Sequence, residues 1–168
     1  MPFSAELVRD FVNTYDADAD ELSSPAEVAL WLRERGLAGP GDRAGDDDLG
    51  TALALCEGLR AALRREPSGL PALPLLVVAG AGRPELVPAG EGVRAGLAAI
   101  AAASVGGSWD RLKVCAEGTC QRAFIDTSRN RSRSWCSMRV CGNRTKTRAY
   151  RARKRGSRRL QGSNTDTV

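Results

Sequence analysis

Apolar residues in the first 105 positions recur mostly at the three- and four-residue spacing of amphipathic helices. The first stripe, in residues 3–13, consists of Leu7, Val8, Phe11 and Val12. Ser4 precedes it and is a suitable N-cap residue. The pattern therefore predicts a first helix with one face turned toward a core.

A second helix is predicted over residues 24–36. Ser24 can cap it, Pro25 suits the first turn, and Glu27 completes an S-x-x-E capping box. Gly36 can end the helix. The residues expected to face the core are Val28, Trp31 and Leu32.

Two further helices complete the expected first half. The third has three aspartates at its start, residues 46–48, and arginines at its end, as the helix dipole favours, and it carries the stripe Leu49, Leu53, Cys56, Leu59 and Leu63. A thiol within such a stripe is expected to be a buried core residue and not a ligand or nucleophile. The fourth spans residues 91–105 and carries Val93, Leu97 and Ile100.

The acidic runs at 16–21 and 46–48 are interpreted as loop and helix-start charges and not as a metal site.

Residues 67–92 differ from this pattern because they contain five prolines and several glycines. Residues 75–78 and 85–87 can pair as a short hairpin across a turn at 80–83. The sequence GAGRPE matches neither G-x-G-x-x-G nor a phosphate loop, so it is interpreted as a turn. The fold class expected is α+β, mainly α.

The net charge of +5 conceals two opposite halves. Residues 1–110 carry a net charge of −8 and residues 111–168 carry +13. A basic module attached to an acidic one indicates a polyanionic partner for the basic part. We expect a domain over 1–108, a basic module over 109–156 and a disordered tail over 157–168.

Several classes of function are excluded or disfavoured by composition. The N-terminus has no basic leader followed by an apolar run, and no apolar segment is long enough for a membrane helix, so a cytoplasmic protein without membrane contact is expected. The chain contains no histidine. This removes Ser-His-Asp and Cys-His catalysis and His-containing zinc sites, and we do not expect an enzyme.

Four of the five cysteines form the pattern C-x4-C-x15-C-x4-C. They are Cys115, Cys120, Cys136 and Cys141. Two close pairs separated by a loop suit one tetrahedral zinc ion, and a short charged segment needs such an ion because it cannot bury a sufficient core. The alternatives are two disulfides, which a cytoplasmic protein disfavours, and a redox dithiol, which usually has a two-residue gap. One structural Zn²⁺ is predicted.

The residues around these cysteines predict a treble-clef-like finger. Residues 111–114 and 121–126 are expected to form two strands flanking the turn CAEGTC, in which Gly118 could adopt a positive φ. The second cysteine pair leads into GNRTKTRAYRARKR, a sequence with high helix propensity. Trp135 is expected to pack over the zinc site.

Basic residues follow this helix and the loop before it. Arg144, Arg148, Arg151 and Arg155 would share one helix face, with Lys146, Arg153 and Lys154 beside it, and Arg129, Arg131 and Arg133 alternate in the loop and would point the same way if it were extended. Guanidinium groups on a metal-held frame suit phosphate contacts, and a basic helix fits a major groove. The other reading is a basic tail that keeps the protein soluble.

The run SRNRSRSWCSMRVCGNR resembles the CGNR zinc finger family, which takes its name from residues 141–144. The segments DFVNTYD and SSPAEVALWLRERGL resemble, less closely, the ABATE domain that accompanies this finger. The resemblance implies a bacterial, stress-induced transcriptional regulator with the four cysteines as ligands and a finger that binds DNA.

Together these observations predict a zinc-dependent DNA-binding regulator whose N-terminal domain binds a small molecule or a protein partner or mediates assembly, for example as a homodimer. Structured RNA is an alternative partner because phosphate contacts do not distinguish the two polymers. A second alternative is an adaptor whose basic finger docks on acidic protein surfaces.

Overall fold

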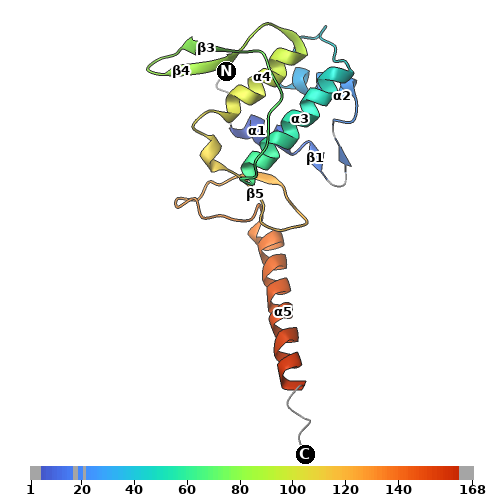
Figure 1. Ribbon diagram of the computed structural model, residues 1–168, viewed down its shortest axis with the longest axis vertical. Coiled ribbons are helices and arrows are strands. Elements are labelled where there is room, and N and C mark those ends of the chain that lie inside the picture. Colours follow the sequence, from blue (N-terminus) through green and yellow to red (C-terminus); the bar gives the residue numbers. More distant parts are fainter. Residues whose placement is uncertain (1–4, 17–18, 21, 163–168) are drawn as a thin grey trace, which may run out of the picture.

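The computed structural model describes residues 5–16, 19–20 and 22–162. Four helices form the upper part of the molecule: α1 (Ala5–Val12), α2 (Pro25–Glu34), α3 (Asp46–Leu63) and α4 (Gly92–Ser104) (Figure 1). Helix α4 packs against the other three. The largest fully buried side chains of this core include Phe11, Leu32, Leu55, Leu97 and Ile100. The expected helical first half is confirmed.

Helix α2 begins and ends as its sequence predicts, with one difference. The Ser24 hydroxyl accepts a hydrogen bond from the Glu27 N–H at 3.3 Å. The Glu27 carboxylate, however, accepts from the backbone N–H of Ser23 at 2.8 Å and not from that of Ser24. Gly36 has a φ of +68°, and the N–H of Leu37 donates to the carbonyl of Leu32, which closes the helix. The predicted cap of α1, Ser4, lies outside the described residues.

The buried face of α3 is rotated from the predicted stripe. Leu53 is 42% exposed, whereas Ala52, Leu55, Cys56 and Leu59 are buried. The predicted stripe and the observed buried face both have helical spacing, so spacing alone does not choose between them. In the structure the small Ala52 faces the core in place of Leu53. The prediction for Leu53 was therefore wrong, and that for Cys56 is confirmed: its thiol lies 3.7 Å from the Phe11 carbonyl oxygen, and burial raises its pKa.

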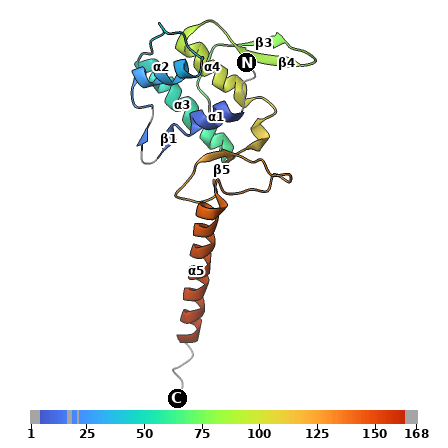
Figure 2. The same cartoon turned by 180° about the vertical axis from the view of Figure 1, so that it is seen from behind.

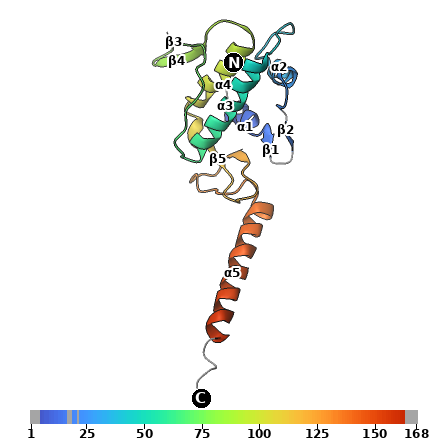
Figure 3. The ribbon, with the colours of Figure 1, turned by 45° about the vertical axis from the view of Figure 1, so that its right-hand side comes forward.

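The predicted hairpin is present as β3 (Leu75–Ala79) paired antiparallel with β4 (Pro84–Pro88). It projects beside α4 at the upper left of Figure 1 and is seen from another side in Figure 3. Helix α4 packs on β4 more than on β3. A further two-residue ladder joins β1 (Tyr15–Asp16) to β2 (Ala19–Asp20) within the first acidic run, a feature that the sequence analysis missed.

The C-terminal module is joined to the helices through a shared core. Its strands β5 (Leu112–Val114) and β6 (Ala123–Ile125) pair antiparallel, as predicted; β5 packs on α3 and β6 on α1. Leu112 and Ala123 belong to the same buried cluster as the helices. The Asn13 side chain donates to the Ala123 carbonyl at 2.9 Å and accepts from the Ala123 N–H at 2.8 Å. The base of the finger is therefore anchored on the first domain.

Helix α5 (Asn143–Gly162) projects away from the rest of the protein, as the view from behind shows (Figure 2). It follows a π-helical turn, η2 (Met138–Gly142). The helix includes residues 157–162, which were expected to belong to a disordered tail; the sequence RRLQ at 158–161 favours helix. Residues 163–168 lie outside the described chain. Among the described helices, none is both long and apolar enough to cross a membrane.

Candidate metal centre

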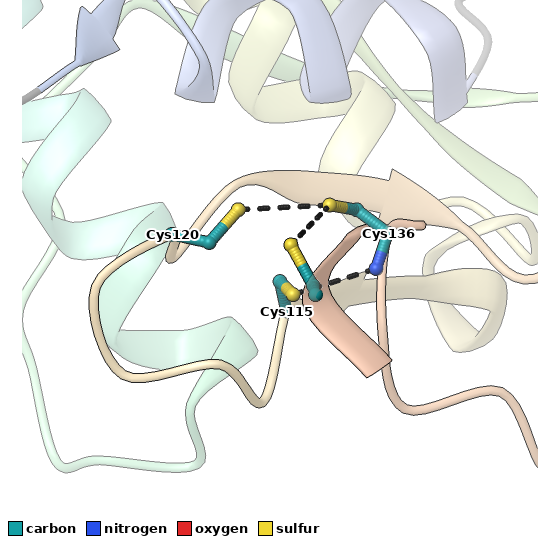
Figure 4. A group of neighbouring side chains, drawn as sticks. Cys115, Cys120 and Cys136 are labelled. Carbon is teal, nitrogen blue, oxygen red and sulfur yellow. Dashed lines mark hydrogen bonds between the residues drawn. The ribbon is translucent and has the colours of Figure 1, made fainter. Parts of the chain in front are cut away.

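The four predicted cysteine ligands meet at one point between the β5–β6 hairpin and η2. Their four sulfur atoms all lie within 4.8 Å of one another. The Cys136 sulfur is 3.6 Å from that of Cys120 and 3.7 Å from that of Cys141 (Figure 4). Ligands 2.3 Å from a tetrahedrally coordinated zinc ion would be about 3.8 Å apart. The cluster therefore fits one structural Zn²⁺ held by four thiolates.

Backbone contacts shape the first zinc knuckle, Cys115–Cys120, and link it to the second, Cys136–Cys141. The Cys115 N–H donates to the Arg122 carbonyl at 2.8 Å, and the Cys120 N–H donates to the Glu117 carbonyl at 3.0 Å. The Cys136 N–H donates to the Cys115 sulfur at 3.4 Å. In the first knuckle the positive φ belongs to Gln121, at 49°, and not to Gly118, so that prediction was wrong. Residues other than glycine occupy this region uncommonly and at some cost, where the surroundings hold them.

Burial governs the ionisation of these thiols. It raises the pKa of Cys136 and of Cys141, and the neighbouring thiols raise the pKa of Cys136 further. Burial also opposes ionisation of Cys115, but hydrogen bonds from the backbone of Cys136 and Glu117 outweigh it and lower the pKa of Cys115. Since zinc binds thiolates, metal binding must release protons from this cluster.

Each residue of the CGNR motif has a defined structural place. Cys141 is one of the four clustered cysteines, and a Cβ on Gly142 would lie 2.5 Å from the Met138 sulfur. The Asn143 side chain donates to the Arg139 carbonyl at 3.0 Å, which holds the π-helical turn to the start of α5. Arg144 reaches back to the Thr119 hydroxyl at 3.4 Å. The motif therefore couples the second knuckle to the first.

Glu117 is a buried carboxylate between the first knuckle and α5. It is 1% exposed, and its oxygens lie 2.9 Å from Arg148 Nη2 and 3.6 Å from Arg144 Nη1. Hydrogen bonds from the side chain and backbone of Thr119, followed by the Arg148 charge, lower the pKa of Glu117. Sequence reasoning missed this residue, because Glu117 and Arg148 are 31 positions apart and leave no local signal.

Asp126 is a second buried carboxylate and organises the loop before Cys136. It is fully buried and receives hydrogen bonds from Lys113 Nζ at 2.6 Å, from Ser128 and from the Arg133 backbone N–H at 3.0 Å. The Lys113 contact, followed by those of Ser128, lowers the pKa of Asp126. Lys113 also donates to the Arg131 and Arg133 carbonyls. These contacts fix a loop that the sequence analysis treated as extended.

The three loop arginines do not point the same way, which corrects the prediction. Arg133 turns inward: its guanidinium donates to the Trp135 and Cys136 carbonyls and lies 5.3 Å from the centre of the Phe124 ring. Arg131 has a φ of +49° and faces Asp110 at 3.7 Å. Arg129 is exposed. The alternation failed because the loop bends around Asp126.

The predicted basic face of α5 is present. Arg144, Arg148, Arg151 and Arg155 line one shallow groove along the helix. Lys146, Arg151, Arg153, Lys154 and Arg155 are exposed, and none of them is within salt-bridge distance of a carboxylate in the described part of the chain. Trp135 packs with Phe124 and the cysteines, as expected. Arg144 and Arg148, at the start of this helix face, thus pair with Glu117, and Arg151 and Arg155 face solvent.

Comparison with known families gives two matches. Residues 5–119 match the family ABATE, described as "Putative stress-induced transcription regulator", and residues 111–154 match the CGNR zinc finger. A comparison with curated proteins gave no match. The second match includes all four clustered cysteines and residues 143–154 of α5.

Proposed function

Because this chain belongs to the ABATE family and carries a CGNR zinc finger, we propose that it is a DNA-binding transcription regulator that contacts DNA phosphates through α5. A zinc ion bound by the four clustered cysteines would hold the two knuckles together and thereby fix the start of the helix. The contacts to DNA come from arginine and lysine side chains of the chain itself. No catalytic step is proposed.

The observation that carries this proposal is the exposed basic surface of the projecting helix. Arg151 and Arg155 share its groove with Arg144 and Arg148, and Lys146, Arg153 and Lys154 add charge beside it. Like charges at this density repel one another on a free helix, and a polyanion relieves that repulsion. A helix of this width fits a DNA major groove, and guanidinium groups bind phosphate in a bidentate manner.

The N-terminal domain offers a place for a signal. An open cleft of about 840 Å³ lies between the end of α2 and the start of α4. It is bordered by Leu7, Asp10, Arg35, Asp42 and Glu91. We propose that a small molecule or protein partner of this domain modulates DNA binding. Reduced thiolates are needed for the zinc site, so we also propose that the protein acts in the cytoplasm.

A salt titration of binding to duplex DNA tests the function. The zinc-loaded protein should bind random duplex with an affinity that falls steeply as salt rises. Arg151→Ala together with Arg155→Ala should reduce the log-log slope by about 1.8, since each lost phosphate contact is worth about 0.9. The matched control removes two exposed arginines of the acidic half, Arg43→Ala with Arg83→Ala, and should leave the slope unchanged.

Competition with RNA decides between the polymers. Duplex DNA and structured RNA of equal length are compared at the same salt concentration, because phosphate contacts alone bind both. If structured RNA bound more tightly than duplex DNA, RNA would become the proposed partner. Absence of binding to either polymer, with zinc present, would favour the adaptor in which the basic helix docks on an acidic protein surface.

A further inference from the structure

The outer strand of the β3–β4 hairpin exposes apolar side chains on both of its faces. Leu76 is 55% exposed, Val77 is 72% exposed and Val78 is 38% exposed. Successive residues of a strand point to opposite faces, so neither face of this segment is covered by the core. Helix α4 packs mainly on β4, so β3 is supported chiefly by its partner strand. The hairpin therefore has the character of a surface that is completed by a partner.

The pattern of hydrogen bonds within the hairpin determines which backbone N–H and C=O groups of β3 point away from β4. The Gly80 N–H donates to the Arg83 carbonyl, and the Ala89 N–H donates to the Pro74 carbonyl. Bonded pairs alternate along an antiparallel ladder, so Leu76 and Val78 bond to β4. The N–H and C=O groups of Leu75, Val77 and Ala79, which we call the β3 edge, therefore point away from β4. Within the described chain no other segment hydrogen-bonds to the β3 edge.

The outer edge of β4 has few N–H groups with which to pair an added strand. By the same alternation, the outward residues of β4 are Pro84, Leu86 and Pro88. The two prolines have no N–H group and cannot donate to an added strand. Proteins commonly protect their sheet edges with proline or charge. The β3 edge carries neither, so the hairpin is protected on one side and open to strand addition on the other.

We propose that the β3 edge pairs with the β3 edge of a second copy of this chain, antiparallel and centred on Val77. In that register Val77 faces its symmetry mate, Leu75 faces Ala79, and Leu76 faces Val78. All three outward residues of each copy then exchange hydrogen bonds with the partner, whereas a shift in either direction loses some of them. The result is a four-stranded antiparallel sheet with two-fold symmetry.

A second copy fits this edge because the strand is complementary to itself. Every pair in the proposed register is apolar, and no charge faces another charge. A two-fold interface requires one patch to match itself, and an antiparallel strand with an uncharged centre meets that requirement. The pairing is smaller than a typical stable interface of roughly 800 Å² per partner, so we expect a reversible, concentration-dependent dimer.

Sedimentation equilibrium of the zinc-loaded full chain without DNA tests the proposal. The mean mass should rise toward that of a dimer between about 1 and about 100 µM. Val77→Lys and Val77→Glu should each weaken association at least about tenfold, because like charges would stand directly opposite each other. An equimolar mixture of the two variants should recover a heterodimer. Ala81→Lys makes the same charge change in the exposed turn, outside the ladder, and should associate like the unaltered protein.

Each outcome of these experiments either supports or overturns the proposed pairing of the β3 edges. Recovery in the mixture would support pairing centred on Val77 even if either variant were less stable than the unaltered protein. A protein that stays monomeric at about 100 µM would overturn the proposal and leave the edge to a strand of another protein. Unchanged dimerisation in both variants would place the interface elsewhere. Because DNA is absent, these outcomes are independent of the proposed function.

Discussion

The carboxylate of Glu117 lies 2.9 Å from the guanidinium of Arg148 and joins the first zinc knuckle to the second turn of α5. Glu117 is buried, and Arg148 is largely exposed. The pair therefore fixes the direction in which the helix leaves the metal centre. It also neutralises part of the positive charge that phosphate would meet, so the contact both orients the helix and competes with DNA.

Glu117→Gln should strengthen binding to random duplex DNA. The amide keeps the shape of the side chain and can still accept from Thr119, but it no longer attracts Arg144 and Arg148 as an ion pair. If both arginines move to phosphates, the log-log salt slope increases by up to about 1.8. Fluorescence anisotropy at several salt concentrations measures this change.

Glu66→Gln is the matched control, because it removes one negative charge from an exposed side chain of the first domain. It should leave the slope of DNA binding unchanged. Weaker binding by Glu117→Gln, with loss of amide protection in the first turns of α5, would show that orientation of the helix matters more than competition for its arginines.

Arg133 and Arg129 should have separable effects although both stand in one basic loop. Arg133→Ala removes the donors to the Trp135 and Cys136 carbonyls, so it should accelerate zinc loss to a chromophoric chelator several-fold. Arg129 is exposed, and Arg129→Ala should lower the salt slope of DNA binding by about 0.9 without changing zinc loss. Equal rates of zinc loss in both variants would contradict the structural role of Arg133.

Features set by neighbours in sequence could be predicted from sequence. The cap of α2 at Ser24, the turn that pairs β3 with β4 and the four ligand cysteines all depend on residues a few positions apart or on a regular spacing. A helix stripe is more ambiguous, because an alanine such as Ala52 marks a buried position only when its packing partners are known.

Features that depend on distant partners could not be predicted. The contact between Glu117 and Arg148 joins the first knuckle to α5, and Arg133 turns inward because the loop bends around Asp126. Likewise, charge and cysteine spacing indicated a separate C-terminal module, yet Leu112 and Ala123 share the core of the helices. Such contacts arise only when the chain is folded, so no periodicity reports them.

Asn13→Ala should weaken the coupling between the finger and the helices. The side chain makes both hydrogen bonds to the backbone of Ala123, and its loss leaves two β6 groups without these partners. We expect the free energy of unfolding to fall by about 1–3 kcal/mol. Urea unfolding of the zinc-loaded protein measures it. Asn130→Ala, at an exposed loop position, should change the value by less than about 0.5 kcal/mol.

Acid should release the zinc before it neutralises Asp126. Zinc binding requires ionised thiols, and burial raises the pKa of Cys136 and Cys141, so protons compete with the metal as the pH falls. The pKa of Asp126 is lowered in the fold, so its stabilising contribution is present above the ordinary aspartate pKa and is lost only at more acidic pH. Zinc release and α5 amide protection, followed together from pH 7 downward, should therefore change in one transition while the Asp126 carboxylate is still ionised.

Cys136→Ser provides the corresponding test at neutral pH. It removes the sulfur nearest to two of the other ligands, so the protein should lose zinc and the ordered structure of residues 115–142. Since β5 and β6 pack on α3 and α1, the helices should also become less stable, although they retain their own core. Cys56→Ser, which alters a thiol of that core, should retain one zinc per chain. A Cys136→Ser protein with full zinc content and unchanged α5 protection would exclude Cys136 as a ligand.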